Sequence, residues 1–247
     1  MSGALSRGIL LATLALGITG PGCVDKGTQD IVVKRALLFD ANCVPDLNAV
    51  GSLAAGAFDI KNTSYVLSLE VNNNVVAEFT PEGREVIGRH LFLYEGTDVT
   101  LTSDDEAFNN IDVKLRQYVV PGFGTINPST GVGGNASKLA ATISLFPPAL
   151  LQDATFRSLA ARQGGFRVFA SMEVFGTMDD SSLSANTVKF PIDVCEGCLL
   201  RTLGMCDQFN TMFKFAGSSC FPGQDQITEC CTSPTGVAIC PGKGTMQ

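Results

Sequence analysis

The chain has 247 residues and a formal net charge of −7 at pH 7. This acidic balance argues against a nucleic-acid partner and against broad electrostatic adhesion to anionic lipid. The length allows one large β domain, or one domain with an appendage.

The N-terminal residues 1–22 have the composition of a secretory signal peptide. A single charge, Arg7, precedes the short apolar run of residues 8–18, which is the order of regions in such a leader. The run is too short to cross a bilayer as a stable helix, which needs about 20 apolar residues. We therefore expect the chain to be exported and residues 1–22 to be removed.

Cys23 follows the leader directly, after Gly20, Pro21 and Gly22. A small residue before a cysteine at the end of an apolar leader resembles the lipobox of bacterial lipoproteins. The resemblance implies acylation of Cys23 and cleavage before it, which leaves a mature chain with 16 basic and 24 acidic side chains. It also implies a membrane partner through the lipid anchor, and an outer-membrane or cell-surface location that faces the periplasm or the exterior. Plain secretion with Cys23 as an odd thiol, and a retained anchor helix, are the alternatives.

Alternating apolar and polar residues dominate residues 23–194. The alternation is clearest in residues 64–72, which place Ser68, Glu70 and Asn72 on the outward face. The other predicted strands lie at 31–39, 53–60, 90–101, 111–119, 139–145, 166–174 and 188–194. A period of two is typical of half-buried strands, and polar turns without βα alternation favour an antiparallel sandwich. We expect an all-β, Ig-like β-sandwich of about seven to nine strands.

Two stretches between the predicted strands depart from the alternation. Residues 124–138 are rich in Gly, Asn, Ser and Thr, and they predict a long exposed loop. Residues 146–153 begin with Phe146-Pro147-Pro148, and proline suits the first turn of a helix. We therefore expect a short helix there.

The last segment, residues 195–247, holds seven of the nine cysteines and has no periodic apolar stretch. Such a segment cannot build its own core, so we expect an irregular extension that is stapled by disulfides. The spacing Cys195-x-x-Cys198 is also compatible with a zinc site or with thiol redox chemistry. Export to an oxidising compartment favours structural disulfides over both alternatives. The cysteines predicted to form them are Cys43, Cys195, Cys198, Cys206, Cys220, Cys230, Cys231 and Cys240.

The number of cysteines constrains how they pair. Seven cysteines in the tail are an odd number, so complete pairing requires Cys43 to join one of them. We therefore expect a disulfide between the first part of the mature chain and the tail. Cys230 and Cys231 are adjacent, and bridging neighbours strains the intervening peptide, so we expect them to have different partners.

Patterns that indicate catalysis or metal binding are weak. The one histidine, His90, lies in a strand-like run, and the chain contains no Gly-x-Ser-x-Gly motif. The acidic turns at 104–106 and 179–180 offer carboxylates for calcium, but polar turns between strands need no such explanation. We expect no enzymatic activity, no cofactor and no catalytic or metal-binding residues. A hydrolase built on His90 and a calcium-binding protein that uses the acidic turns are the alternatives.

The end of the chain is similar to that of a group of predicted bacterial lipoproteins without an assigned activity. The run from Phe190 to Leu199, followed by Cys206 and by Cys220-Phe221-Pro222-Gly223-Gln224-Asp225, carries this resemblance. It implies an envelope location and no catalytic residues. The sequence thus predicts a signal peptide at 1–22, a β-sandwich at 23–194 and a stapled tail at 195–247. The expected role is structural or binding, with a protein, glycan or polymer partner at the cell envelope.

Overall fold

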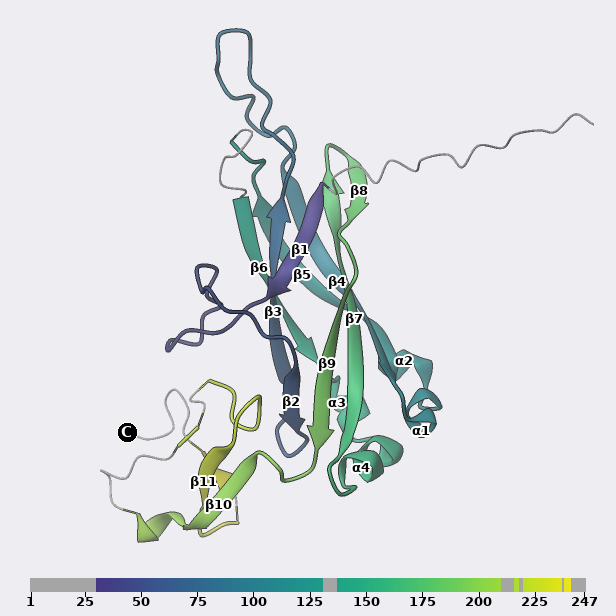
Figure 1. Cartoon of the computed structure of the whole chain (residues 1–247), viewed down its shortest axis with the longest axis vertical. Coiled ribbons are helices and arrows are strands. Elements are labelled where there is room, and N and C mark those ends of the chain that lie inside the picture. Colours follow the sequence, from purple (N-terminus) through teal and green to yellow (C-terminus); the bar gives the residue numbers. More distant parts are fainter. Residues whose placement is uncertain (1–29, 131–136, 210–215, 218–219, 237, 241–247) are drawn as a thin grey trace, which may run out of the picture.

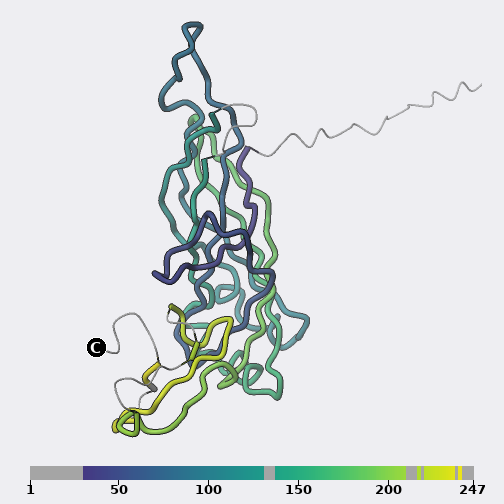
Figure 2. The backbone as a smooth tube through the Cα atoms, turned by 60° about the vertical axis from the view of Figure 1, so that its left-hand side comes forward, coloured from purple at the N-terminus to yellow at the C-terminus, as the bar shows by residue number. Residues whose placement is uncertain are grey.

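The computed structural model describes residues 30–130, 137–209, 216–217, 220–236 and 238–240. Two β-sheets lie face to face in an elongated sandwich, with the C-terminal tail at one end (Figure 1). The connection of residues 74–91 projects from the other end (Figures 1 and 2). The predicted all-β class is confirmed. The predicted leader and Cys23 lie outside the described residues.

The smaller sheet is antiparallel, and its strands follow the order β1-β3-β6. Its members are β1 (Ile31–Ala36), β3 (Tyr65–Asn73) and β6 (Ser137–Leu145). Leu69 of the central strand β3 lies opposite Ala36 of β1 and Ala141 of β6. All three side chains are buried, because the alternation turns the apolar face of each strand toward the second sheet.

The larger sheet follows the order β2-β9-β7-β4-β5, and β8 pairs with β7. Its members are β2 (Gly56–Asp59), β4 (Phe92–Ser103), β5 (Gln117–Ile126), β7 (Phe166–Met178), β8 (Ser181–Ser184) and β9 (Val188–Cys195). Strand β2 runs parallel to β9, so the sheet is mixed and the prediction of a purely antiparallel sandwich was wrong at this edge. These two strands are far apart in sequence, so no hairpin turn imposes an antiparallel direction on them.

The inner faces of the two sheets form one apolar core. At the end near the tail the core is aromatic. The ring of Phe58 stacks on that of Phe146, with 5.0 Å between centroids, and Phe156 lies 5.7 Å from Phe146. Burying one such side chain stabilises a fold by about 1.5–3 kcal/mol. Strand β2, which carries Phe58 of this cluster, also forms main-chain hydrogen bonds with Gly223 and Asp225 of the tail.

The outward face of the smaller sheet is not exposed to solvent, contrary to the simple alternation. Ser68, Glu70 and Asn72 all point outward yet are buried. Arg35 of β1 makes an ion pair with Glu70 at 2.7 Å, and its guanidinium also donates to carbonyl oxygens of the segment 37–53. The segment therefore lies across this face, and the buried polar groups on it are paired.

Among the described residues, four short α-helices lie at the turns between strands. They are α1 (Glu106–Asn109), α2 (Val113–Arg116), α3 (Pro148–Leu151) and α4 (Ala154–Ala160). Helix α3 confirms the helix predicted after Phe146, with Pro148 in its first turn. The strand predicted at 111–119 was wrong in its first half. Asp112 caps α2 by accepting a hydrogen bond from the Lys114 N–H, and this local bond outweighs the alternation.

The long exposed loop predicted at 124–138 was wrong at both of its ends. Strand β5 continues to Ile126, which is fully buried, and β6 begins at Ser137. Between them, Ser129 is buried and exchanges main-chain hydrogen bonds with Val75 and Ala77. Residues 131–136 lie outside the described part of the chain.

The tail also contains regular structure where it is described. Its elements are β10 (Leu200–Met205), the 3-10 turn η1 (Cys206–Gln208), β11 (Thr228–Thr232) and β12 (Ala238–Ile239). They form a three-stranded sheet in which β10 and β11 are parallel and β11 and β12 antiparallel. The prediction of an irregular extension was therefore wrong for these residues, because disulfides replace the apolar core that a free sheet of this size needs.

Candidate functional site

A disulfide between Cys43 and Cys220 ties the tail to the sandwich, with 5.2 Å between the two Cα atoms. This is the kind of bridge that the odd number of tail cysteines predicts. Cys43 lies in the segment 37–53, so the bridge fixes the tail to the same segment that covers the smaller sheet. The tail is also held by the contacts of residues 223–225 with β2 and β3, which we call the junction.

The remaining bridges all lie within residues 195–240. They pair Cys195 with Cys198, Cys206 with Cys231, and Cys230 with Cys240. The prediction that the adjacent Cys230 and Cys231 take different partners is confirmed. Cys230 and Cys231 are both buried, so these two bridges act as the core of the tail sheet.

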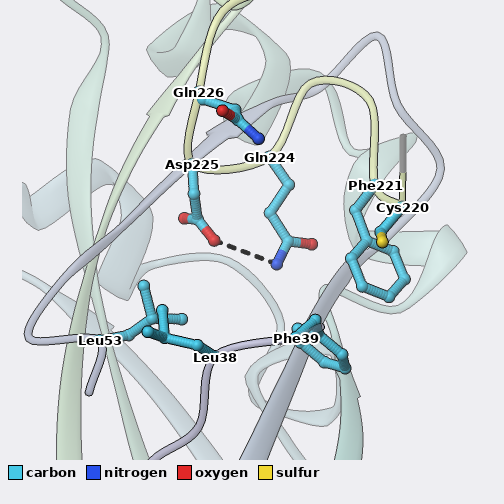
Figure 3. Close-up of a pocket in the computed structure, with 8 residues that line it drawn as sticks. All are labelled: Leu38, Phe39, Leu53, Cys220, Phe221, Gln224, Asp225 and Gln226. Carbon is cyan, nitrogen blue, oxygen red and sulfur yellow. Dashed lines mark hydrogen bonds between the residues drawn. The ribbon is translucent and has the colours of Figure 1, made fainter. Parts of the chain in front are cut away.

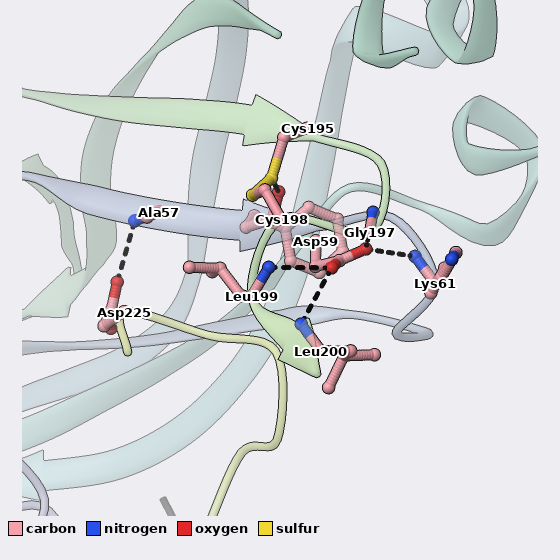
Figure 4. Close-up of a disulfide and its surroundings, with 10 residues drawn as sticks. Ala57, Asp59, Lys61, Cys195, Gly197, Cys198, Leu199, Leu200 and Asp225 are labelled. Atoms are coloured by element: carbon pink, nitrogen blue, oxygen red, sulfur yellow. Dashed lines mark hydrogen bonds between the residues drawn. A yellow bond between two sulfur atoms is a disulfide. The ribbon is translucent and has the colours of Figure 1, made fainter. Parts of the chain in front are cut away.

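Asp59, the last residue of β2, anchors the start of the tail (Figure 4). Its fully buried carboxylate accepts four main-chain hydrogen bonds. Oδ1 accepts from the N–H groups of Lys61 at 3.1 Å and Gly197 at 2.9 Å, and Oδ2 accepts from those of Leu199 at 3.0 Å and Leu200 at 3.1 Å. Hydrogen bonds to a charged acceptor are stronger than neutral ones. One side chain thus organises the loop that carries the Cys195–Cys198 bridge.

Gln224 joins the tail to the edge of β3. Its side-chain Oε1 accepts from the Val66 N–H at 2.9 Å, and its Nε2 donates to the Val66 carbonyl at 2.7 Å. A side-chain amide thereby takes the place of a neighbouring strand beyond the end of β1. Asn186 does the same for Val33 of β1, with bonds of 2.8 and 3.2 Å. Both amides satisfy edge groups that are otherwise unpaired.

Asp225 completes the junction from an unusual backbone conformation, with φ at +61°. Its Oδ1 accepts from the Tyr65 hydroxyl and from the Ala57 N–H, each at 2.9 Å. Its own N–H donates to the Ala57 carbonyl at 2.8 Å. Burial, together with the nearby Asp225 carboxylate, raises the pKa of Tyr65 well above its usual value. The Tyr65 hydroxyl therefore stays protonated and remains a donor.

A pocket of about 160 Å³ opens between the segment 37–53 and the tail (Figure 3). Leu38, Phe39, Leu53 and Phe221 supply an apolar lining. Gln224, Asp225, Gln226 and Cys220 complete the lining. A cavity of this size holds a group about as large as benzene, whereas pockets for larger ligands span about 300–1,000 Å³. The pocket therefore suits one apolar side chain of a partner better than a whole cofactor.

Sequence reasoning did not single out Asp59, and it quoted Gln224 and Asp225 only as part of a resemblance. The available signal was the run Gly223-Gln224-Asp225, which begins three residues after Cys220, because polar residues beside a glycine in a stapled segment indicate a defined turn. Nothing local marks Asp59 as an anchor of the tail, since three of the four partners of its carboxylate are main-chain groups about 140 residues away.

His90 lies at the opposite end of the sandwich, also at positive φ (+57°). Its Nδ1 is 2.6 Å from Oδ2 of Asp179, and its main-chain N–H donates to Oδ1 of the same carboxylate at 3.0 Å. These bonds, above all the main-chain one, lower the pKa of Asp179 below its usual value. A second pocket lies beside Asp179, and its described lining includes Thr177 but no serine or cysteine. His90 therefore has a carboxylate partner, and that lining offers it no serine or cysteine nucleophile.

The acidic turns are occupied by structural contacts. Asp105 caps α1 through the Ala107 N–H and makes an ion pair with Arg162. Asp179 and Asp180 form the turn between β7 and β8, both at positive φ. In the part of the chain that the structure describes, these turns belong to no group of three side chains placed to hold a metal.

One such group does exist among the described residues, formed by Asp59, Cys195 and Cys198. Its two sulfurs are joined to each other in a disulfide. Its carboxylate oxygens already accept two N–H bonds each. The arrangement therefore serves the fold of the loop, and a zinc ion would have to displace both sets of bonds.

Comparison with known protein families and with curated proteins finds no match to this chain. Among the described residues, no helix combines the length and the apolar character needed to cross a membrane.

Proposed function

We propose that this chain is an exported, lipid-anchored protein of the cell envelope that binds a partner and has no catalytic role. The observation that carries the proposal is the set of four disulfides. Disulfides persist in secreted, periplasmic and surface proteins, whereas the cytosol keeps thiols reduced. The apolar leader of residues 8–18 and the cysteine directly after it support export with an anchor at Cys23.

Replacing Cys23 with serine tests the anchor. The wild-type chain is expected to partition into detergent and to fractionate with membranes, because an anchor of two or more acyl chains attaches a protein durably to a membrane. The Cys23→Ser variant is expected to lose almost all of its membrane-bound fraction. Intact mass before and after reduction measures the lipid, the cleavage site and the number of disulfides together. A wild-type protein without lipid that begins at another residue would contradict the proposal.

The junction pocket supports a binding role, and we assign it to an apolar side chain of an envelope protein. The disulfide, Gln224 and Asp225 hold its walls in place, so little conformational entropy is lost on binding. Glycan recognition has less support, because the chain lacks tryptophan and the apolar side of the lining consists of Leu and Phe.

A photoreactive amino acid at Leu38, inside the pocket, is expected to crosslink to a protein partner in intact cells. The same probe at Val50 is the matched control, since Val50 lies in the same segment, is fully exposed and is not part of the lining. Adding Leu53→Lys is expected to lower the yield about tenfold or more, because a lost 1.4 kcal/mol of binding energy is a factor of ten. Equal products at both positions, unchanged by Leu53→Lys, would remove the pocket from the proposal.

A hydrolase that uses His90 is the second candidate, and the 2.6 Å contact with Asp179 is the observation that favours it. Turnover in a hydrolase screen that is lost in His90→Ala, together with no crosslinked partner at Leu38, would replace the binding proposal with this one. The calcium alternative is tested by melting the protein with calcium and with a chelator. We expect the two melting temperatures to agree.

A further inference from the structure

The connection between β3 and β4 forms a narrow projection, which we call the finger (residues 75–89). Its two legs are joined by main-chain bonds, from the Val86 N–H to the Glu78 carbonyl at 2.8 Å and from the Thr80 N–H to the Arg84 carbonyl at 2.7 Å. The finger extends beyond both sheets at the end of the molecule opposite the tail (Figures 1 and 2). It adds little to the core, so its length needs an explanation other than stability.

The base of the finger is held firmly. The Asn73 side chain donates to the His90 carbonyl at 2.7 Å and to the Ile126 carbonyl at 3.1 Å. His90 in turn binds Asp179 through both its ring and its N–H. On the other leg, the Ala77 N–H donates to the carbonyl of buried Ser129 at 2.9 Å. These contacts fix the direction in which the finger leaves the sandwich.

The finger exposes large apolar side chains. Ile87 is 96% exposed, Phe79 is 49% exposed and Val76 is 44% exposed. Single exposed apolar residues are ordinary, but the exposed Phe79 and Ile87 both lie on a narrow projection, where an apolar medium could bury them.

The N-terminal chain enters the fold beside this base. Asp30 directly precedes β1, and its carbonyl accepts from the N–H of Asn74, the residue just before the finger, at 2.8 Å. A chain anchored at Cys23 has seven residue steps to Asp30, which span at most about 25 Å when fully extended. An extended strand from Asn74 to the tip at Gly83 spans about 30 Å. The linker is therefore too short to hold the base of the finger far from a membrane that carries the anchor.

We propose that the finger contacts the phospholipid bilayer that carries the anchor, with Phe79 and Ile87 inserted among the acyl chains next to the headgroups. This inference rests on the lipid anchor of the proposed function. Because the linker keeps the base of the finger within about 25 Å of the membrane, the projecting finger can reach the bilayer at its tip or along its side. Apolar side chains of interfacial segments bury about 5–10 Å into the boundary between headgroups and acyl chains.

The charges on the finger specify the kind of lipid surface. The segment carries Arg84 and Arg89 against Glu78, Glu82 and Glu85, and Arg89 lies 3.8 Å from Glu78. A net negative projection gains nothing from anionic lipid. The contact is therefore apolar, it forms on zwitterionic phosphatidylcholine, and it does not weaken at high salt.

The absence of tryptophan from the chain allows a direct test. Three lipidated full-length variants, Phe79→Trp, Ile87→Trp and Val113→Trp, are bound to phosphatidylcholine vesicles with brominated acyl chains, which quench tryptophan. Val113 is the control because it is 48% exposed and lies on α2, at the other end of the sandwich. Tryptophan at 79 and 87 is expected to emit at shorter wavelength and to be quenched severalfold more than tryptophan at 113, equally at low and high salt.

The outcomes separate the two proposals. Quenching at 79 and 87 but not at 113 supports the finger contact. Lipidated, vesicle-bound protein whose tryptophans at 79 and 87 are quenched no more than the one at 113 overturns the finger contact and leaves the anchor standing. Protein whose intact mass shows no lipid overturns both proposals together.

Discussion

Replacing both Cys43 and Cys220 with serine is expected to lower the free energy of unfolding by about 5 kcal/mol. The bridge joins residues 177 positions apart, and in the chain-entropy description the stabilisation grows with the logarithm of the closed loop. This is the longest loop that any of the four bridges closes. The midpoint and the denaturant slope of guanidinium unfolding, measured on the oxidised protein, together give the loss.

The Cys195→Ser, Cys198→Ser double variant is the matched control for this experiment. Its bridge closes a sequence separation of only 3, so the same description expects about 2 kcal/mol. The order of the two losses is the sharper test, since both variants remove one disulfide. Equal losses would mean that native contacts, and not loop closure, set the value of these bridges.

Asp59→Asn is expected to cost about 3–5 kcal/mol, the second large effect. An amide of the same shape keeps one accepting oxygen and turns its NH2 toward two main-chain N–H donors. Two hydrogen bonds to a charged acceptor are then lost, each worth about 1.5–3 kcal/mol, and buried donors are left unpaired. We expect a lower unfolding midpoint and faster reduction of the Cys195–Cys198 bridge by dithiothreitol, because the carboxylate holds the loop around it.

Asp193→Asn is the control for Asp59, because it changes the same group two residues before Cys195. The Asp193 carboxylate is exposed and binds Arg167 at 2.7 and 3.0 Å. Solvent screens exposed ion pairs, so the loss of stability is expected to be much smaller than for Asp59→Asn, and we expect no change in the rate of reduction. If both variants lose the same stability, the buried hydrogen bonds of Asp59 are not what holds the tail.

The strands of the sandwich were predictable because their side chains alternate with a period of two over many residues. Residues 64–72, 139–145 and 166–174 each carry that period, and each lies within an observed strand or one residue from its start. The link from Cys43 to the tail followed from counting, since an odd set of tail cysteines needs one partner elsewhere. Neither inference requires knowledge of how distant segments meet.

The errors arose where a single local bond or a distant partner outweighed the pattern. The apolar residues around Val113 alternate as a strand would, yet the Asp112 cap turns them into a helix. The junction was not predictable for the second reason. Gln224 holds the tail because it forms hydrogen bonds with the main chain of Val66. Asp59 does so because it accepts hydrogen bonds from Leu199 and Leu200. Both sets of contacts are between segments far apart in sequence, so they depend on the whole fold.

The pairing of Gln224 with Val66 protects this protein against aggregation. An unpaired strand edge is a template on which another chain can add a strand, and this is a common route to aggregation. Gln224 occupies that edge only while the tail stays docked. Loosening the junction therefore exposes the unpaired main chain of Val66 at the edge of β3, while the rest of the sandwich is still folded. Such a molecule would be lost to association with its own copies before its core melted.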